Sequence, residues 1–165
     1  MQHSLDVLEF PLIKANLASF ASTSLGKGRI ESLSLLPLDD LKVEWENLTF
    51  AWDAIYVHGH FPVSSSVDCS KPLAMAHRGY RLSGEDFRNL IVNIDNAVAL
   101  KRYFASLEGD SPLRKRATNL QDLSSLAMTI DSVVSSDGSL RDNASPELKR
   151  LRNNIARLED RKSVV

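Results

Sequence analysis

The chain has 165 residues, of which 43% are hydrophobic and 25% charged, an ordinary composition for a soluble domain with its own core. Its formal net charge of −1 excludes nucleic-acid binding by overall charge and leaves that role to a local basic patch. The single cysteine excludes an internal disulfide and the multi-cysteine zinc patterns, and it fits a cytoplasmic location. No signal peptide is recognisable, and no apolar run approaches the roughly 20 residues that cross a bilayer, so no membrane partner is expected.

Helical periodicity dominates the first third of the chain. Pro11 favours a helix start, and a second short helix is expected from about Ser24 to Leu35. The buried stripe of the first helix is expected to be Ile13, Leu17 and Phe20. A longer helix is predicted between Pro37 and Gly59, because apolar residues recur there at spacings of four, three, four and three. Those residues are Leu41, Trp45, Leu48, Trp52 and Ile55, and we expect both tryptophans to lie in the core.

The middle of the chain alternates loops with further helices. Residues 58 to 72 are expected to form a loop, followed by a short helix from Pro72 to Arg78. Ser83 is predicted to cap a long helix, with Asp86 three residues on in a variant of the capping box. Its packed side is expected to be Phe87, Leu90, Ile91, Ile94, Val98, Lys101 and either Phe104 or Leu107. Gly109 and Pro112 are expected to break the chain before another helix. That helix is indicated by Leu120, Leu123, Leu126, Ile130 and Val133.

The last segment carries the clearest pattern. Asp137-Gly138 is a turn dipeptide, Ser145 is a candidate helix N-cap, and Pro146 suits the first helical position. The helix that follows has a narrow apolar seam formed by Leu148, Leu151, Ile155 and Leu158. The basic residues around that seam are Lys149, Arg150, Arg152, Arg157 and Arg161. Only residues 5 to 10 and 139 to 141 are candidates for extended backbone, so the predicted fold is an all-α helical bundle with a projecting C-terminal helix.

Candidate chemical groups are few. His58, His60 and His77 offer nitrogen ligands for a metal, but they lack the spacing of a zinc site, and a solvated loop is the favoured interpretation. Cys69 has no orienting residue or oxyanion loop beside it and is expected to be a small buried or half-buried filler. No catalytic, cofactor-binding or metal-binding residue is predicted in this chain.

Phosphate-binding patterns are incomplete. The segment Leu25-Gly26-Lys27-Gly28 lacks the first glycine and the final Ser or Thr of a nucleotide-binding P-loop. Asp137 and Asp142 are expected to accept turn and capping hydrogen bonds. Two basic clusters, residues 114–116 and the basic residues of 149–162, can in principle meet nucleic-acid phosphates, although a solvated helix face explains them as well.

Several motifs in series resemble the MutS family. The early ones are Leu8-Glu9-Phe10, Leu25-Gly26-Lys27, Leu36-Pro37 with Asp39-Asp40, Arg81-Leu82-Ser83-Gly84-Glu85-Asp86 and Leu100-Lys101-Arg102-Tyr103-Phe104. The later ones resemble the type 2 branch, whose members carry a C-terminal Smr nuclease domain. The residues of that signature are Asp137, Gly138, Arg141, Asp142, Ser145, Pro146, Glu147 and Leu148, followed by Arg150-Leu151-Arg152.

The resemblance implies a function that the residues alone do not. Full-length members are homodimeric ATPases and endonucleases that use ATP and Mg, and they are linked to branched DNA, recombination suppression and ribosome rescue. This chain resembles their N-terminal core and lever region. The resemblance therefore implies a helical core domain at residues 1–143 and the start of a lever or clamp coiled-coil helix at residues 144–165. The expected partner is the remainder of a MutS-like chain.

We therefore expect a non-catalytic lever fragment that couples ATPase motion to a nucleic-acid clamp by rigid-body movement of packed helices. A free-standing helical adaptor is one alternative, in which the C-terminal seam recruits a partner helix. A weak nucleic-acid binder that uses the basic C-terminal helix is another.

Overall fold

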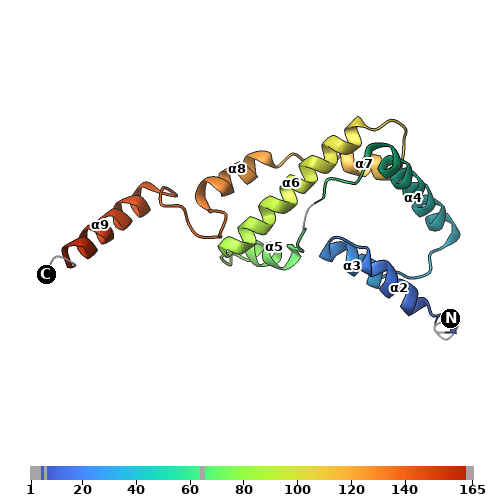
Figure 1. Ribbon diagram of the computed structural model, residues 1–165, viewed down its shortest axis with the longest axis horizontal. Helices are drawn as coiled ribbons and strands as arrows, with labels where there is room; N and C mark the ends of the chain where they lie inside the picture. Colours follow the sequence, from blue (N-terminus) through green and yellow to red (C-terminus); the bar gives the residue numbers. More distant parts are fainter. Residues whose placement is uncertain (1–4, 6, 64–65, 163–165) are drawn as a thin grey trace. The chain divides into compact units, whose positions relative to one another are not determined.

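The computed structural model describes residues 5, 7–63 and 66–162 (Figure 1). Within these residues the regular elements are eight helices, so the predicted all-α class is confirmed. They are α2 (Phe10–Ser19), α3 (Ser24–Glu31), α4 (Leu38–His58), α5 (Ser70–His77), α6 (Gly84–Ser106), α7 (Pro112–Thr118), α8 (Ser124–Val133) and α9 (Pro146–Lys162). An isolated antiparallel bridge joins Val134 to Leu140.

The described residues fall into two compact units, and helix α6 contributes residues to both. One comprises the described residues of Met1–Asp68 and Val92–Asp122, and the other those of Cys69–Ile91 and Leu123–Val165. The predicted boundary between residues 143 and 144 separates a core domain from the start of a lever helix. It does not coincide with the limits of these two units and stays a prediction. In the part of the chain that the structure describes, no helix is both long enough and apolar enough to span a membrane.

Side-chain caps fix the starts of several helices where the sequence predicted them. At α6 the Ser83 and Asp86 pair forms the expected reciprocal box. The Asp86 amide donates to Ser83 Oγ at 3.1 Å, and the Ser83 amide donates to Asp86 Oδ2 at 2.9 Å. These hydrogen bonds, led by the one from the Ser83 hydroxyl, lower the pKa of Asp86. At the C-terminal end of α4, Gly59 adopts a φ of 83°, and the helix ends there as predicted.

The core of the first unit forms where α4 meets the C-terminal half of α6 and α7. Ala54, Phe104, Leu107 and Ala117 are buried there, and Phe50, Phe61, Leu100, Tyr103 and Leu113 pack around them. The Phe61 ring lies 5.3 Å from Phe104 and 5.4 Å from Tyr103, the second contact being edge-on. Buried Asn47 accepts a hydrogen bond from the Leu113 amide at 2.9 Å, which joins α4 to the first turn of α7 (Figure 1).

The face of α4 that packs differs from the predicted one. We expected Trp45 and Trp52 in the core, yet Trp45 is 67% exposed and Trp52 is 72% exposed. The helix buries Asn47 and Ala54 instead and turns Phe50 toward the core. Both faces of α4 are apolar, and small side chains at Ala54 and Ala117 allow close helix approach where indole rings would not fit. The expectation of a tryptophan core was therefore wrong.

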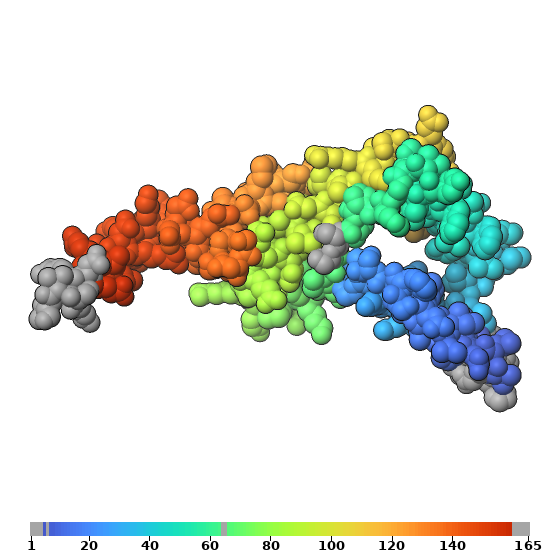
Figure 2. Space-filling view, viewed as in Figure 1, coloured from blue at the N-terminus to red at the C-terminus, as the bar shows by residue number. Residues whose placement is uncertain are grey.

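The packed face of α2 was also assigned wrongly. Ile13, Leu17 and Phe20 are exposed, whereas Phe10, Lys14 and Ala18 are partly buried at a spacing of four. The Lys14 ammonium donates to the Glu31 carbonyl oxygen at 2.8 Å, near the C-terminal end of α3. Helices α2 and α3 are in contact with each other, and they form the blue part of the space-filling view (Figure 2). The packed side of α2 is therefore the one that carries Phe10, Lys14 and Ala18.

The remaining differences concern element boundaries. Extended backbone was expected at residues 5 to 10, but residues 5 and 7 to 10 form helix and turn, and residue 6 lies outside the described residues. Helix α5 begins at Ser70, inside the predicted loop, and α8 begins only at Ser124. The largest omission is α7, because Pro112 begins a helix where a chain break was expected. The long α6 helix matches its predicted packed side, with Ile91, Ile94 and Phe104 buried along the predicted stripe, and Leu107 is buried just after the helix ends.

Candidate interface at the C-terminal helix

A hydrogen-bonded turn precedes the C-terminal helix. The Gly138 amide donates to the Ser135 carbonyl oxygen at 3.0 Å, and the Ser135 amide donates to the Ser139 carbonyl oxygen at 2.8 Å. Gly138 has a φ of 81°, a left-handed conformation that favours glycine. The turn reverses the chain, so that the Arg141 amide reaches the Val133 carbonyl oxygen at 2.8 Å. The predicted Asp137-Gly138 turn is therefore present.

Asp137 holds this turn from inside. Its carboxylate accepts hydrogen bonds from the Ser135 hydroxyl and from the Ser139 amide, the latter at 3.0 Å. These bonds favour the charged form and lower the pKa of Asp137 from 3.8 to about 2, with the Ser135 hydroxyl as the largest cause. This is the turn role that the sequence predicted for Asp137.

Asp131 joins three segments of the second unit. Its carboxylate accepts from Arg88 Nη1 of α6 at 2.7 Å and from Arg141 Nη2 at 3.3 Å. Arg141 Nε also donates to the Asp131 carbonyl oxygen at 2.6 Å. The Asp131 cluster, meaning Asp131 with Arg88 and Arg141, therefore holds the segment after the turn against α6 and α8. Sequence reasoning missed Asp131 and Arg88, since their positions carry no pattern of their own.

A close backbone contact holds the turn against the start of α6. A Cβ atom at Gly84 would lie 1.7 Å from the Gly138 carbonyl oxygen, a distance that no real side chain can adopt. Glycine at 84 is therefore required by this approach, although its own φ is ordinary for any residue. Gly84 was part of the predicted helix-start motif, but its contact with Gly138 had no signal in the sequence.

Two interactions fix the start of α9. The Leu148 amide donates to Ser145 Oγ at 3.1 Å, so Ser145 is the N-cap that the sequence predicted. Arg152, one turn further on, pairs with the Asp142 carboxylate and donates to the Leu140 carbonyl oxygen at 3.2 Å. Glu147 lies in the first turn, where a negative charge complements the helix dipole. The signature residues from 137 to 148 thus form one scaffold that sets where α9 begins.

The apolar seam of α9 is open to solvent beyond its first turn. Leu148 is partly buried, whereas Leu151, Ile155 and Leu158 are 47%, 54% and 56% exposed. A stripe at this spacing is the pattern by which one helix pairs with another. The seam therefore has the form of an unfilled helix-pairing surface within this chain.

The basic residues of α9 are not equivalent. Lys149, Arg150 and Arg157 are exposed, while Arg152 is engaged by Asp142 and Leu140. The side chain of Arg161 lies outside the part of the chain that the structure describes. The face available to an anionic partner is therefore narrower than the five predicted residues suggested.

The other predicted basic cluster is built into the fold. Arg114 Nε donates to the Phe104 carbonyl oxygen at 3.1 Å, and its Nη1 donates to the Gly109 carbonyl oxygen at 2.8 Å. Lys115 forms an ion pair with Asp110 at 2.9 Å. Two of its three cations thus stabilise the end of α6 and the following turn.

The segment compared with a phosphate-binding loop lies inside helix α3. The Lys27 amide donates to the Thr23 carbonyl oxygen at 3.1 Å, and the Gly26 amide donates to Thr23 Oγ1 at 3.0 Å. A phosphate loop needs such amides free to face the anion. Here they close the first turn of a helix.

Three histidines and one cysteine were the candidates for metal and thiol chemistry. Residues 5, 7–63 and 66–162 contain no group of three His, Cys, Asp or Glu side chains placed to hold a metal ion. His58 and His77 instead end helices α4 and α5, and His60 follows α4. Cys69 is 6% exposed, which confirms the prediction of a small buried filler.

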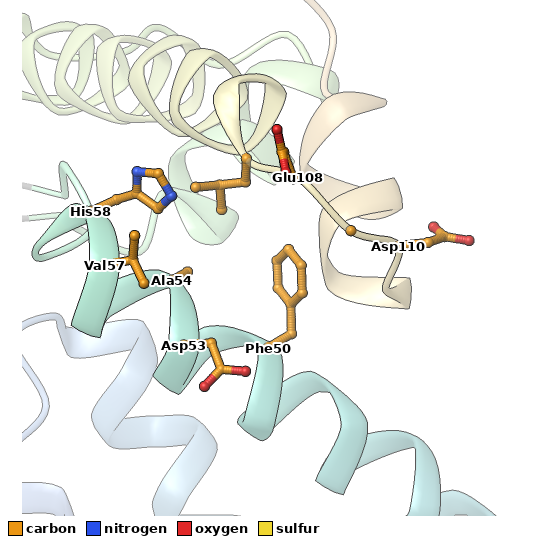
Figure 3. A pocket seen from close by; sticks show the side chains of 9 residues that line it. Phe50, Asp53, Ala54, Val57, His58, Glu108 and Asp110 are labelled. Atoms are coloured by element: carbon orange, nitrogen blue, oxygen red, sulfur yellow. The ribbon is translucent and has the colours of Figure 1, made fainter.

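An open cavity of about 320 Å³ lies beside the C-terminal half of α4 (Figure 3). Phe50, Val57 and Leu107 line its apolar part, and Asp53, Glu108 and Asp110 contribute carboxylates. In this view Asp53 and Asp110 lie on either side of the Phe50 ring. The cavity is therefore acidic at its margin and has an aromatic floor, a setting that suits a cationic side chain better than an anion.

Comparison with known proteins gives one consistent result. The sequence matches no protein-family model. It is 27% identical over 165 residues to Endonuclease MutS2 of Bacillus velezensis and 29% identical over 167 residues to Putative endonuclease MutS2 of Bacillus subtilis, in each case across 97% of this chain. It is also 31% identical over 163 residues to Endonuclease MutS2 of Symbiobacterium thermophilum. The chain is similar to MutS2 proteins.

The similarity to MutS2 has a defined extent. It covers 97% of this chain but only 20% or 21% of each of these three relatives, so the chain spans about a fifth of their length. The matched region includes the turn, the Asp131 cluster and the α9 start described above. The similarity to the proteins named MutS2 endonucleases therefore extends over the helical chain described here and over no more than about a fifth of each relative.

Proposed function

We propose that this chain is the helical core, with the first part of the lever helix, of a MutS2-like protein of the cytoplasm. In this role α9 carries displacement from an ATPase region toward a nucleic-acid clamp. ATP and Mg would bind in the portion of the longer protein that this chain does not match. The chain itself would contribute no catalytic residue.

The open seam of α9 is the observation that carries the proposal. Its beginning is fixed by the Ser145 cap and by Arg152, whereas the apolar residues beyond that point are about half exposed. A lever needs this combination, because one end must be held while the other is free to pair with a helix that transmits force. The chain matches only about a fifth of the length of each MutS2 relative, so the rest of a longer, MutS2-like chain would supply that second helix.

The non-catalytic part of the proposal is supported by what α3 does with its backbone. The Gly26 and Lys27 amides close a helical turn, so they have no free donor to offer a nucleotide phosphate. We therefore expect the isolated chain to hydrolyse no ATP. A turnover that one substitution in this chain abolishes would contradict this expectation.

A chimaeric protein tests the lever role. The chain replaces the matching segment of Bacillus velezensis Endonuclease MutS2, and DNA binding is measured with and without ATP. The intact chimaera should bind branched DNA in a nucleotide-dependent way. Leu151→Glu with Ile155→Glu should remove that dependence while ATP hydrolysis persists, because charged seam residues cannot pair with the second helix.

A matched control carries the same two charges on another face. Asn153→Glu with Ala156→Glu places them away from the seam of α9. This variant should keep the nucleotide dependence. If the seam variant and the control behave alike, the seam does not transmit motion and the lever proposal is wrong.

Nucleic-acid binding by α9 is the second candidate, favoured by the exposed Lys149, Arg150 and Arg157. Contacts between these side chains and phosphates would give weak, salt-sensitive binding without sequence preference. An adaptor role remains the third candidate and would use the same apolar seam for an unrelated helix. The chimaera separates the adaptor from the lever, since an adaptor seam has no effect on nucleotide coupling.

A further inference from the structure

Helix α5 packs through its first turn and is open to solvent beyond it. Cys69 is buried and Pro72 is partly buried, whereas residues 73–81 are all exposed. Met75 is 48% exposed and Tyr80 is 63% exposed, so large apolar side chains lie on this surface. A single exposed apolar side chain is ordinary. The feature that sets this surface apart is the charge around its apolar residues.

The segment that contains α5 carries positive charge only. Between Asp68 and Glu85 the chain contains no acidic residue. It contains three basic ones, Lys71, Arg78 and Arg81, a formal charge of +3 in a chain whose net charge is −1. Within residues 5, 7–63 and 66–162, these three side chains form no ion pair. Such a local excess of positive charge favours a partner with negative charge.

Helical spacing groups the charged and apolar residues. Lys71, Met75 and Arg78 follow one another at four and three residues, which places them on one face of α5 and its C-cap. Tyr80 and Arg81 come directly after the helix end. We call these five residues the α5 patch. Its members are thus an apolar centre, Met75 and Tyr80, and three cations.

A glycine cap holds the end of the α5 patch in one conformation. Gly79 has a φ of 83°, and its amide donates to the Ala76 carbonyl oxygen at 2.9 Å. The Tyr80 amide donates to the Met75 carbonyl oxygen at 3.0 Å. This pair of hydrogen bonds is the common glycine-capped helix end, which returns the residue after the glycine toward the last turn. Side chains on a fixed backbone lose less conformational freedom when a partner binds.

The apolar centre of the patch distinguishes between anionic partners. Nucleic acid offers phosphates, but three cations support only weak, salt-sensitive contact, and the Met75 side chain has no counterpart in a phosphate backbone. An acidic polypeptide offers both kinds of group. Its carboxylates suit the forked donors of Arg78 and Arg81, and its apolar side chains suit the adaptable thioether of Met75. The patch therefore fits an acidic polypeptide better than a nucleic acid.

We propose that the α5 patch is a docking site for an acidic segment of another protein, in which carboxylate and apolar side chains alternate. The carboxylates pair with Arg78 and Arg81, and an apolar side chain lies against Met75 and Tyr80. The inference concerns residues 71–81 alone and does not rest on the proposed lever function.

A labelled synthetic peptide tests the inference with the full 165-residue chain. The peptide is short and alternates glutamate with leucine and tyrosine. The comparison probes are the same peptide with lysine in place of glutamate and a single-stranded DNA of equal charge. Fluorescence anisotropy should give a Kd of about 10–100 µM for the acidic peptide and binding weaker by about tenfold or more for both other probes. Absent binding of the acidic peptide, or tighter binding of the DNA, would overturn the inference.

Charge reversal locates the binding site. Arg78→Glu with Arg81→Glu should weaken binding of the acidic peptide by about tenfold or more. The matched control is Arg102→Glu with Arg116→Glu, which makes the same change of charge at two exposed arginines of the other unit. This control should bind the peptide as the wild-type chain does. Equal losses in the two variants would show that only net charge matters, and the inference would be wrong.

The basic helix α9 is the other surface that could attract the peptide. Arg150→Glu with Arg157→Glu should leave the affinity unchanged, because these residues lie outside the α5 patch. Loss of binding in this variant, with binding retained after reversal at residues 78 and 81, would place the peptide on α9 and contradict the inference.

Substitution of the capping glycine tests whether the fixed backbone matters. A Cβ atom at residue 79 would have no atom within 4 Å, so only the backbone conformation opposes a side chain there. Gly79→Ala should weaken binding by about threefold or more, because alanine disfavours this left-handed conformation. Gly79→Asn should bind nearly as the wild-type chain does, since asparagine tolerates it. Wild-type affinity in the alanine variant would contradict the role given to the cap.

Discussion

The Gly138 carbonyl oxygen occupies the space that a side chain at residue 84 would need, with a Cβ atom there only 1.7 Å away. Glycine at 84 therefore lets the turn before α9 approach the first residues of α6. Gly84→Ala should force these segments apart and lower the free energy of unfolding by about 1–3 kcal/mol, the usual cost of overpacking. Urea denaturation of the full chain measures this change.

A second glycine provides the matched control. Gly28 lies within α3 and has no atom within 4 Å of the position that a Cβ would take. Gly28→Ala should be neutral or raise the free energy of unfolding by up to about 1 kcal/mol, since alanine favours a helix more than glycine does. Equal effects of the two substitutions would show that the Gly84 contact is unimportant.

Asp137 should make stability depend on pH at the acid end. Its pKa is about 2 in the folded chain and near its ordinary value of 3.8 when unfolded. The carboxylate therefore contributes stability that is fully present above about pH 4 and is lost as the pH falls through about 2. Asp137→Asn should flatten this part of the stability profile. Carbon NMR titration of the Asp137 carboxyl group checks the pKa itself, and a midpoint near 4 would contradict the turn geometry.

Ser145 should stabilise α9 locally. Ser145→Ala removes the acceptor for the Leu148 amide and should cost about 1 kcal/mol, whereas Ser145→Asp should retain the cap. Hydrogen exchange at the first amides of α9 is the appropriate measurement, because fraying of one helix changes exchange before it changes global unfolding. Unaltered exchange in the alanine variant would mean that Arg152 alone fixes the helix start.

The basic face of α9 makes a separate prediction about nucleic acid. Arg150→Glu with Arg157→Glu should abolish any binding to a DNA duplex at low salt. If the wild-type chain binds, its salt dependence should correspond to only about two or three phosphate contacts, because three exposed cations are available. A much steeper salt dependence would require cationic residues beyond Lys149, Arg150 and Arg157.

Local signals were sufficient for many of the elements but not for their packing. The Ser83 and Asp86 box, the Gly59 terminus and the Ser145 cap depend on residues within a few positions of one another, and each was predicted correctly. Helix α7 was missed because Pro112 was taken as a break. In fact buried Ser111 accepts from the Arg114 amide at 3.0 Å, so proline stands in the first helical turn.

Long-range packing decided what the sequence pattern left open. Periodicity identified the apolar stripe of α4 that contains Trp45 and Trp52, but it could not show that Asn47 and Ala54 would face the core instead. The same limit applies to the scaffold before α9. Its turn and cap were predictable, whereas the meeting of Arg88 and Arg141 at Asp131 was not, because Arg88 is 43 residues from Asp131 in the sequence.

The lever account requires that the α9 seam be open in this chain and covered in a longer MutS2-like protein. Thiol labelling of Ile155→Cys tests this requirement directly, with native Cys69 buried and Asn153→Cys as a control away from the seam. In the isolated chain below about 1 µM, where association of moderate strength is negligible, both cysteines should react fast. In the chimaera the cysteine at 155 should be protected at least tenfold, as expected for a seam closed by about 1.4 kcal/mol or more, while the one at 153 stays reactive. Equally fast labelling at both positions in the chimaera would contradict the account.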